Sequence, residues 1–206
     1  MASLKKRDEE VLSFERPAAW RAWLAAHHAQ TASVLLRIPK GAGLALTYSS
    51  ALDAAIAWGW IDSQKRALDA SAWLQRFGKR TSRSPWSKIN RGRAEALIAA
   101  GAMEAPGQAE VDRARADGRW DRAYDGARAA TVPEDLADAL AKNRKAHAFF
   151  EALDGANRYA ILHRVQTAKR PETRAARIAT FVAMCAAGET LHPKRPPRRA
   201  PSKAQD

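Results

Sequence analysis

A basic segment in the middle of the chain carries the residue types that bind anions. Residues 62 to 93 hold nine Lys or Arg residues against two Asp residues, so they supply +7 of the net charge of +13. Guanidinium groups bind phosphate and carboxylate through paired hydrogen bonds, and the free amides at a helix N-terminus bind the same anions. Ser84 followed by Pro85 is typical of a helix start. We therefore predict a site for an anionic small molecule or a phosphate-bearing partner, built from Arg66, Arg76, Arg80, Ser84, Ser87, Lys88 and Asn90.

The same residues also have a purely structural interpretation. The serines could only cap the helix, while the arginines pair with acidic residues elsewhere. Asp62, at the start of the segment, is the weak candidate for catalysis, as a general base beside an arginine-lined substrate. Nearby arginines favour the ionised carboxylate, which makes it a poor proton acceptor near neutral pH. We therefore expect Asp62 to act structurally, by orienting Arg66, Arg76 or Arg80.

Tryptophan is abundant in the first part of the chain, where all seven residues occur by Trp120. Trp60, Trp73 and Trp86 lie in or next to the basic segment and could form a stacking platform for a base or another planar ligand. Packing in the core is the alternative for each of them.

Two further basic groups lie near the C-terminus. Lys169, Arg174 and Arg177 could extend a basic groove, although exposed helix charges are the simpler interpretation. Residues 193 to 206 carry a net charge of +4, are rich in proline and contain no large apolar residue. Such a segment cannot bury enough surface to offset its ordering entropy, so we expect a disordered basic tail over 191–206.

No metal, cofactor or membrane span is predicted. The five histidines lack the spacing of a zinc site, and Cys185 is the single cysteine. The sequence contains no Gly-x-Ser-x-Gly elbow, phosphate-binding loop or His-Glu-x-x-His motif. No run approaches the ~18 apolar residues of a membrane helix, and the N-terminus turns acidic where a signal peptide would be apolar. We therefore expect a cytoplasmic protein.

Hydrophobic periodicity predicts the elements that must position these residues. We expect helices near 17–29, 50–58, 84–101, 107–117, 133–153, 157–168 and 171–187, with a break near Asn143 as an option in the fifth. We expect strands near 32–38, 60–68 and 71–77. The last two form a hairpin, and a two-residue turn would place Asp62 opposite Phe77 and Arg66 opposite Trp73.

These elements predict an α+β fold. A small, mostly antiparallel sheet of about three strands packs with a predominantly helical C-terminal half. We expect a flexible N-terminus over 1–12 and a single domain over 13–190, followed by the basic tail.

Several short motifs follow one another along the chain. They are Trp58-Gly59-Trp60-Ile61-Asp62-Ser63, Gln75-Arg76-Phe77, Arg80, Ser84-Pro85-Trp86-Ser87-Lys88-Ile89-Asn90, Gly118-Arg119-Trp120, Ala168-Lys169, Glu172-Thr173-Arg174 and Arg177-Ile178. Taken in this order, they resemble the YdeI/OmpD-associated family, also called bacteriocin-protection proteins. The resemblance spans roughly residues 12 to 188, and it departs from the family at Gly78-Lys79-Arg80, where relatives tend to have a Pro-Arg pair.

The resemblance implies a link to envelope stress or to resistance against cationic peptides, with no accepted catalytic mechanism. A protein of charge +13 repels cationic peptides, so any protection would be indirect. We therefore expect a non-catalytic stress- or resistance-associated protein that binds an anionic ligand or partner through its basic hairpin and the following helix. Two alternatives stay open: a nucleic-acid-binding module, and an enzyme acting on a phosphorylated or carboxylated small molecule.

Overall fold

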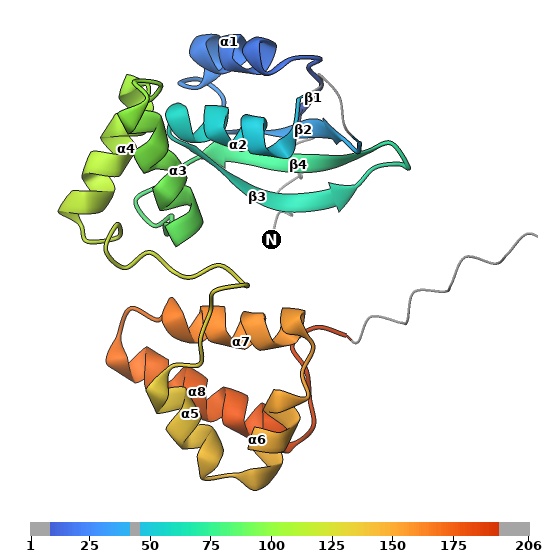
Figure 1. Ribbon diagram of the computed structural model, residues 1–206, viewed down its shortest axis with the longest axis vertical. Helices are drawn as coiled ribbons and strands as arrows, with labels where there is room; N and C mark the ends of the chain where they lie inside the picture. The colour runs from blue at the N-terminus through green and yellow to red at the C-terminus, as the bar shows by residue number, and fades with distance from the viewer. Residues whose placement is uncertain (1–8, 42–45, 194–206) are drawn as a thin grey trace, which may run out of the picture. The chain divides into compact units, whose positions relative to one another are not determined.

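A computed structural model describes residues 9–41 and 46–193 of the chain. The chain divides into two compact units, which we describe separately: unit 1 is Met1–Ala123 and unit 2 is Tyr124–Asp206 (Figure 1). The single domain predicted over 13–190 includes parts of both units. Among the described residues, unit 1 contains the sheet and four helices and unit 2 contains four helices, so the α+β class is confirmed. Within the described ranges, no helix is long and apolar enough to cross a membrane.

The sheet of unit 1 has four strands in the order β1-β2-β4-β3. The two hairpin strands β3 (Trp60–Ala67) and β4 (Ala72–Lys79) pair antiparallel, and β4 also pairs antiparallel with β2 (Ser33–Pro39). These are the three expected strands. The fourth, β1 (Val11–Leu12), runs parallel to β2 and is too short to show any periodicity in the sequence. Residues 9–12 therefore have a defined place in the fold, unlike the flexible segment we expected over 1–12, of which 1–8 lie outside the described residues.

The hairpin contains a β-bulge that the sequence did not predict. Asp62 does face Phe77, but the register shifts between Asp62 and Lys65, so that Arg66 faces Leu74 instead of Trp73. A one-residue shift moves a side chain to the other face of a sheet. Arg66 and Trp73 therefore lie on opposite faces. The buried Gln75 side chain donates to the Ser63 and Gln64 carbonyls at 3.2 and 3.4 Å and so satisfies the backbone at the bulge.

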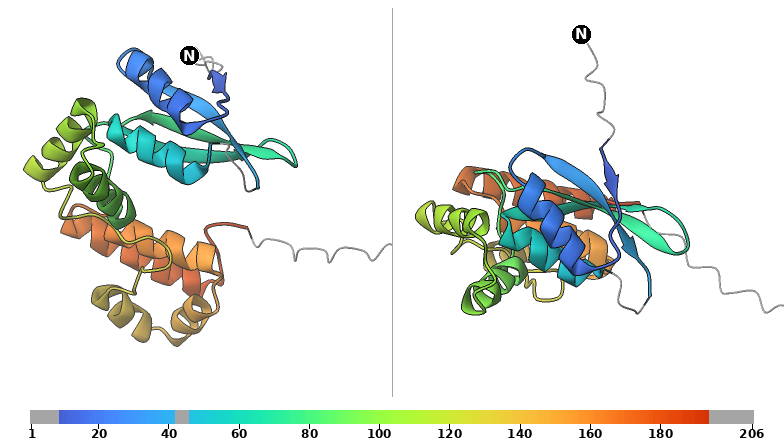
Figure 2. Two further views of the ribbon diagram at one scale, coloured as in Figure 1. Left: turned by 45° about the horizontal axis from the view of Figure 1, so that its top comes forward. Right: turned by 90° about the horizontal axis from the view of Figure 1, so that it is seen from above.

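Two helices cover one face of this sheet, α1 (Pro17–His27) and α2 (Tyr48–Ala57) (Figures 1 and 2). Trp20 of α1 is completely buried among aromatic rings, with its ring centroid 5.9 Å from that of Phe77 and 6.4 Å from that of Trp60. Its indole Nε1 donates to the Ala51 carbonyl of α2 at 3.1 Å. One side chain thus joins α1, α2 and the sheet.

The third helix begins later than the sequence predicts. Helix α3 is Lys88–Ala99, and its N-cap is Ser87, whose Oγ accepts the Asn90 amide at 3.1 Å. Ser84 lies instead in a turn, where its Oγ accepts the Thr81 amide at 3.0 Å. A helix starting at Ser84 would use the carbonyls of Ser84 and Pro85 as its first acceptors. Two arginine side chains occupy these carbonyls, as described below, so the expected start at Ser84 is wrong.

Helix α4 (Ala105–Ala116) follows α3 in unit 1 and packs against the end of α2 at Ala57. A β-carbon added at Gly107 would lie 2.2 Å from the Ala57 carbonyl oxygen, far inside van der Waals contact. Only glycine allows this approach of the two helices.

Unit 2 is a bundle of α5 (Glu134–Ala141), α6 (Arg144–Glu151), α7 (Gly155–Gln166) and α8 (Pro171–Ala186). The optional break near Asn143 is confirmed, because Asn143 Oδ1 accepts the Ala146 amide at 3.1 Å and caps α6. The core includes Phe150, Phe181 and Cys185, and burial raises the pKa of the Cys185 thiol. The Asn157 side chain exchanges two hydrogen bonds with the His192 backbone, so the described chain stays attached to unit 2 as far as that residue. The expected tail lies, from 194 on, outside the described residues.

Unit 2 contains an ion pair that predicts its response to acid. Arg174 donates to both Asp135 oxygens, at 2.6 and 2.8 Å. These hydrogen bonds, against the effect of burial and helped by the Arg174 charge, hold the pKa of Asp135 below its ordinary value. A depressed carboxyl pKa stabilises the fold above the unfolded pKa of about 4, and this stabilisation disappears as the pH falls through the folded value.

We expect Asp135→Asn to lower the neutral-pH stability of unit 2 by up to about 1 kcal/mol, because the pair is partly exposed, and to weaken its acid dependence. Hydrogen exchange of unit 2 amides at several pH values measures both effects. Asp138→Asn removes the same charge from the same helix, and an equal loss in that variant would contradict the assignment.

Candidate functional site

Two of the predicted anion-binding arginines are paired with an acid on the outer face of the sheet, the face opposite α1 and α2. Arg76 Nε donates to Glu9 Oε1 at 2.6 Å, and Arg66 Nη2 lies 3.9 Å from Glu9 Oε2. Ser33 Oγ also donates to Glu9 Oε1, at 2.6 Å. Burial alone would raise the pKa of Glu9, but hydrogen bonds from Ser33 and Arg76 and the charges of both arginines hold it below its ordinary value. Arg66 and Arg76 therefore have a structural partner, which sequence reasoning missed.

Asp62 does not have the role that we expected. Its Oδ2 accepts the Tyr48 hydroxyl hydrogen bond at 2.7 Å, which ties β3 to the first residue of α2. The acid that orients Arg66 and Arg76 is Glu9. Asp62 also lines neither of the two pockets described below. The geometry that the enzyme alternative requires, Asp62 in a pocket with two arginines, is therefore not found at these pockets.

The residues around the expected helix start are also engaged in local structure. Ser87 is buried and its hydroxyl caps α3, while Asn90 is buried in the first turn of that helix. Lys88 is exposed at the first position of α3. Because no helix begins at Ser84, the free amides on which the predicted site depends are not present there.

The three tryptophans of the expected platform do not share an exposed surface. Trp60 and Trp86 are each only 1% exposed, so neither can stack on a nucleic-acid base. Trp73 is half-buried, and the Lys65 ammonium lies over its ring at 4.3 Å. The nucleic-acid alternative therefore loses the aromatic surface that it required.

In the basic group formed by Lys169, Arg174 and Arg177, the two arginines cap the C-terminus of helix α7 in unit 2. Arg174 Nη1 donates to the Val165 carbonyl at 2.9 Å, and Arg177 Nη1 donates to the Arg164 carbonyl at 2.5 Å. Both carbonyls belong to the last turn of α7, where cationic side chains are favourable. Lys169 is exposed between α7 and α8.

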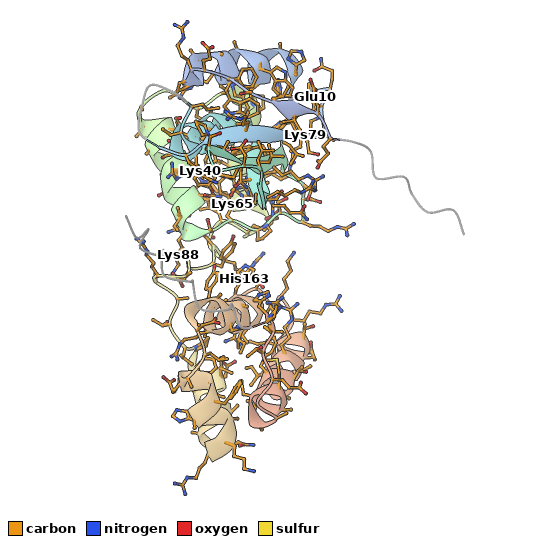
Figure 3. All side chains as sticks on the ribbon, turned by 90° about the vertical axis from the view of Figure 1, so that its right-hand side faces the viewer. Glu10, Lys40, Lys65, Lys79, Lys88 and His163 are labelled. Atoms are coloured by element: carbon orange, nitrogen blue, oxygen red, sulfur yellow. The ribbon has the colours of Figure 1, made fainter. Side chains whose placement is uncertain are left out.

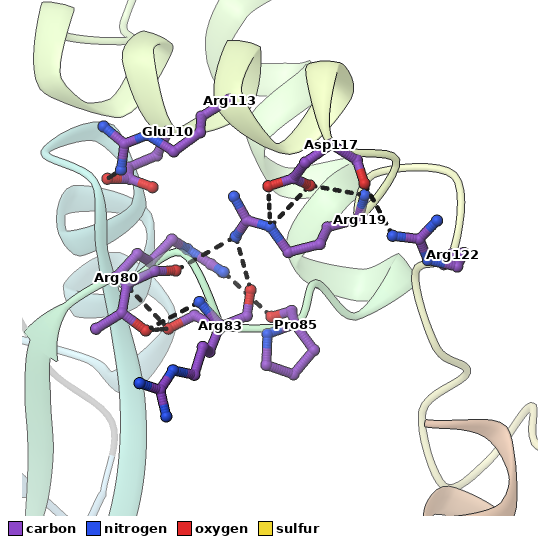
Figure 4. Close-up of polar contacts among 10 residues, drawn as sticks. Arg80, Arg83, Pro85, Glu110, Arg113, Asp117, Arg119 and Arg122 are labelled. Atoms are coloured by element: carbon purple, nitrogen blue, oxygen red, sulfur yellow. Dashed lines mark hydrogen bonds and ion pairs between the residues drawn. The ribbon is translucent and has the colours of Figure 1, made fainter. Parts of the chain in front are cut away.

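Two buried arginines hold the turn at residues 81–85 from either side. Arg119 Nη1 donates to the Ser84 carbonyl at 2.9 Å and to the Thr81 carbonyl at 3.4 Å, while its Nε contacts Asp117 (Figure 4). Arg80 Nη1 donates to the Pro85 carbonyl at 3.2 Å. Both arginines are only 5% exposed.

Arg80 is also fixed by an aromatic ring. Its guanidinium carbon lies 3.5 Å from the centre of the Trp86 ring, and Trp86 packs edge-on against Trp120 at 5.0 Å. A cation held over a desolvated indole is stabilised by the ring quadrupole. Arg80 of the predicted anion site and Trp86 of the predicted platform are thus packed against each other.

The best candidate for a functional site is a cavity of about 300 Å³ in unit 1, which we call the strand-end pocket. It lies where α1 and α2 end, β3 begins and β4 ends, beside the first turns of α4. Its size is at the lower end of the range for small-molecule sites. It is lined by His28, Ala29, Trp58, Gly59, Trp60, Lys79, Arg80, Pro106 and Glu110.

The strand-end pocket combines two cations with aromatic walls. Lys79 ends strand β4 and Arg80 follows it, and Lys79 Nζ donates to the Ala29 carbonyl. The His28 and Trp58 rings contact each other with centroids 4.6 Å apart. Trp60 Nε1 is buried and has no hydrogen-bond partner among the described residues. The pocket thus offers positive charge and planar surfaces.

Glu110 adds an acid to this site. Its Oε1 accepts from Arg113 at 2.7 Å, whereas its buried Oε2 has no hydrogen-bond partner among the described residues. Figure 4 shows Glu110 and Arg113 together with Arg80 and the hydrogen bonds of the turn at residues 81–85. Of the predicted site residues, Arg80 and Trp60 line the pocket, whereas sequence reasoning missed Glu110, Lys79, Trp58 and His28 as a group.

A second, more open cavity of about 710 Å³ lies between α5 and α8 of unit 2. Its lining includes Ile178 and Val182, and its charged Asp135 and Arg174 pair with each other. Lys142 also lines this cavity, which lacks the aromatic rings that line the strand-end pocket. Among the described residues, no cluster of three or more His, Cys, Asp or Glu side chains could hold a metal ion.

Comparisons with protein families divide the chain much as the structure does. Residues 12–110 match a model described as a domain of unknown function (DUF8412). Residues 129–188 match the family described as bacteriocin-protection, YdeI or OmpD-associated, which confirms the resemblance for this segment. Only the motifs between Ala168 and Ile178 lie in that segment. The motifs between Trp58 and Asn90 fall where the other model matches, and Gly118-Arg119-Trp120 lies between the two matched segments. No curated protein and no solved structure matches the chain in these comparisons.

Proposed function

We propose that this chain, whose residues 129–188 match the bacteriocin-protection, YdeI or OmpD-associated family, is a non-catalytic, cytoplasmic stress- or resistance-associated protein that binds a small anionic ligand. The ligand occupies the strand-end pocket of unit 1. It carries a carboxylate or a phosphate on a planar group.

The observation that carries this proposal is the presence of two cations beside the Trp58 and His28 rings in one small cavity. Lys79 and Arg80 supply the charge that attracts an anion. The half-buried Trp58 ring and the His28 ring in contact with it supply planar surface. Few convergent polar groups on an aromatic wall are typical of small-molecule sites.

The charge of the protein limits how it could give protection. At +13 it repels cationic peptides, so direct capture of such peptides is unfavourable. Binding a small anion avoids this repulsion. Protection would then depend on what the bound ligand does in the cell.

Binding of para-toluate, a planar carboxylate, tests the proposal. We expect saturable binding, with the largest nitrogen and proton NMR shifts at the Trp58 and Trp60 indoles. The isosteric neutral amide, para-toluamide, should bind at least about fivefold more weakly, because it lacks the charge that the two cations attract. Absence of saturable binding at these indoles would refute the proposal.

A pair of lysine variants separates the pocket from the general positive field. Lys79→Gln should weaken para-toluate binding by about five- to tenfold, since it removes one of two pocket cations. Lys65→Gln removes the same charge from the same hairpin, away from the pocket, and should leave binding unchanged (Figure 3). Equal losses in both variants would indicate a non-specific electrostatic effect.

A further inference from the structure

We propose that Glu110 makes the strand-end pocket selective for a zwitterionic ligand, one that carries an ammonium or similar cationic N–H group in addition to its anionic group. This inference rests on the proposed function and adds the chemical class of the ligand. It follows from three features of the pocket, which concern its negative charge where Lys79 and Arg80 supply positive charge.

The first feature is the carboxylate itself. Glu110 is only 12% exposed, Arg113 uses one of its oxygens, and the other is buried without a partner among the described residues. An ionised carboxylate with an unused buried oxygen is costly unless a donor reaches it. The last torsion of a glutamate is broad, so a small rotation presents this oxygen to the cavity that Glu110 lines. A ligand ammonium supplies the missing donor.

The second feature is the close packing that fixes Glu110 at this place. Gly59 has φ +73°, and a β-carbon there would lie 3.1 Å from Glu110 Cγ and 2.9 Å from the Pro106 carbonyl oxygen. Gly107 allows α4 to reach the end of α2 in the same way. Two glycines on different elements therefore bring the acid against the pocket wall.

The third feature is the partial negative charge of two helix ends. Helix α1 ends at His27 and α2 ends at Ala57, and the pocket is lined by the residues that directly follow each of them, His28, Ala29, Trp58 and Gly59. A helix C-terminus carries about half a negative charge and favours cations. Lys79 already donates to the Ala29 carbonyl after α1, so the end of α2, at Trp58 and Gly59, is the helix end left to favour a cation of the ligand.

A matched pair of ligands tests this inference. Para-(aminomethyl)benzoate differs from para-toluate by one ammonium group on the same planar carboxylate. We expect the wild-type protein to bind the ammonium compound about tenfold more tightly, as measured by NMR titration of the indole signals. Glu110→Gln should reduce this preference to near unity while para-toluate binding stays within about twofold.

Two control variants exclude a general charge effect and a structural effect. Glu104→Gln makes the same charge change on the residue that precedes α4, outside the pocket, and should keep the tenfold preference. Arg113→Ala removes the partner of Glu110 but keeps the acid, and should keep or increase the preference. Circular dichroism confirms that each variant is folded.

The outcomes separate the two proposals. Wild-type binding of para-toluate with no preference for the ammonium compound, or an unchanged preference in Glu110→Gln, would overturn the zwitterion inference and leave the anion proposal intact. Absence of binding by either compound would overturn both.

Discussion

Replacing Trp20 with alanine should destabilise unit 1 by about 4 kcal/mol, because large-to-small changes of a buried tryptophan lose packing and leave a cavity. Trp20 is fully buried, touches aromatic rings from α1 and two strands, and bonds the Ala51 carbonyl. Total stabilities of domains are only about 5–15 kcal/mol, so this loss is a large fraction of the whole. Hydrogen exchange measures it unit by unit, which matters because the chain has two compact units.

Two variants calibrate that result. Trp20→Phe keeps most of the ring packing but loses the hydrogen bond, and should cost about 1–2 kcal/mol. Ile89→Ala removes an apolar side chain that is 59% exposed on α3, and should change stability by less than about 0.5 kcal/mol. A Trp20→Ala loss below that of Trp20→Phe would show that the aromatic cluster is not the centre of this core.

Gly107→Ala should destabilise unit 1 by about 3 kcal/mol, because the added methyl overlaps atoms that cannot move aside cheaply. Its β-carbon would lie 2.2 Å from the Ala57 carbonyl oxygen and 2.6 Å from Met103 Sδ. Relief requires α4 to move away from α2, which also carries Glu110 away from the pocket. We therefore also expect the preference for the ammonium ligand to fall in this variant, measured by the same titration.

Gly92→Ala is the matched control for this change. Gly92 lies inside helix α3, and a β-carbon there would meet nothing within 4 Å. Alanine in a helix interior is better than glycine by roughly 0.5–1 kcal/mol, so this variant should be slightly more stable than the wild type. Equal destabilisation by both substitutions would contradict the close-approach argument.

The sequence predicted the elements of this fold better than their contacts. Helix periods and caps are local, which is why the break at Asn143 and the core position of Cys185 were predictable. The bulge after Asp62 was not predictable, because residues 62–66 are polar and one extra residue there breaks no hydrophobic alternation. The start of α3 also depends on a distant residue, because Arg119 donates a hydrogen bond to the Ser84 carbonyl, 35 positions earlier in the chain.

The candidate site was predictable only in part, for the same reason. Arg80 and Trp60 belong to the basic hairpin that the composition marked out, and both line the pocket. Glu110 comes from a helix with no unusual charge pattern, and glycine contacts bring it into place. Glu9 is 67 positions from its partner Arg76, and nothing in the spacing of the chain relates them. Tertiary packing determined these partners.

The bulge in β3 has a consequence for the behaviour of the protein in concentrated solution. β3 is an edge strand, and an exposed edge can hydrogen-bond to the edge of a neighbouring molecule and begin aggregation. The register shift after Asp62 interrupts the row of free backbone groups, and Lys65 and Arg66 directly after it repel an identical strand. The same irregularity that redirects Arg66 thus helps to keep molecules of this protein apart.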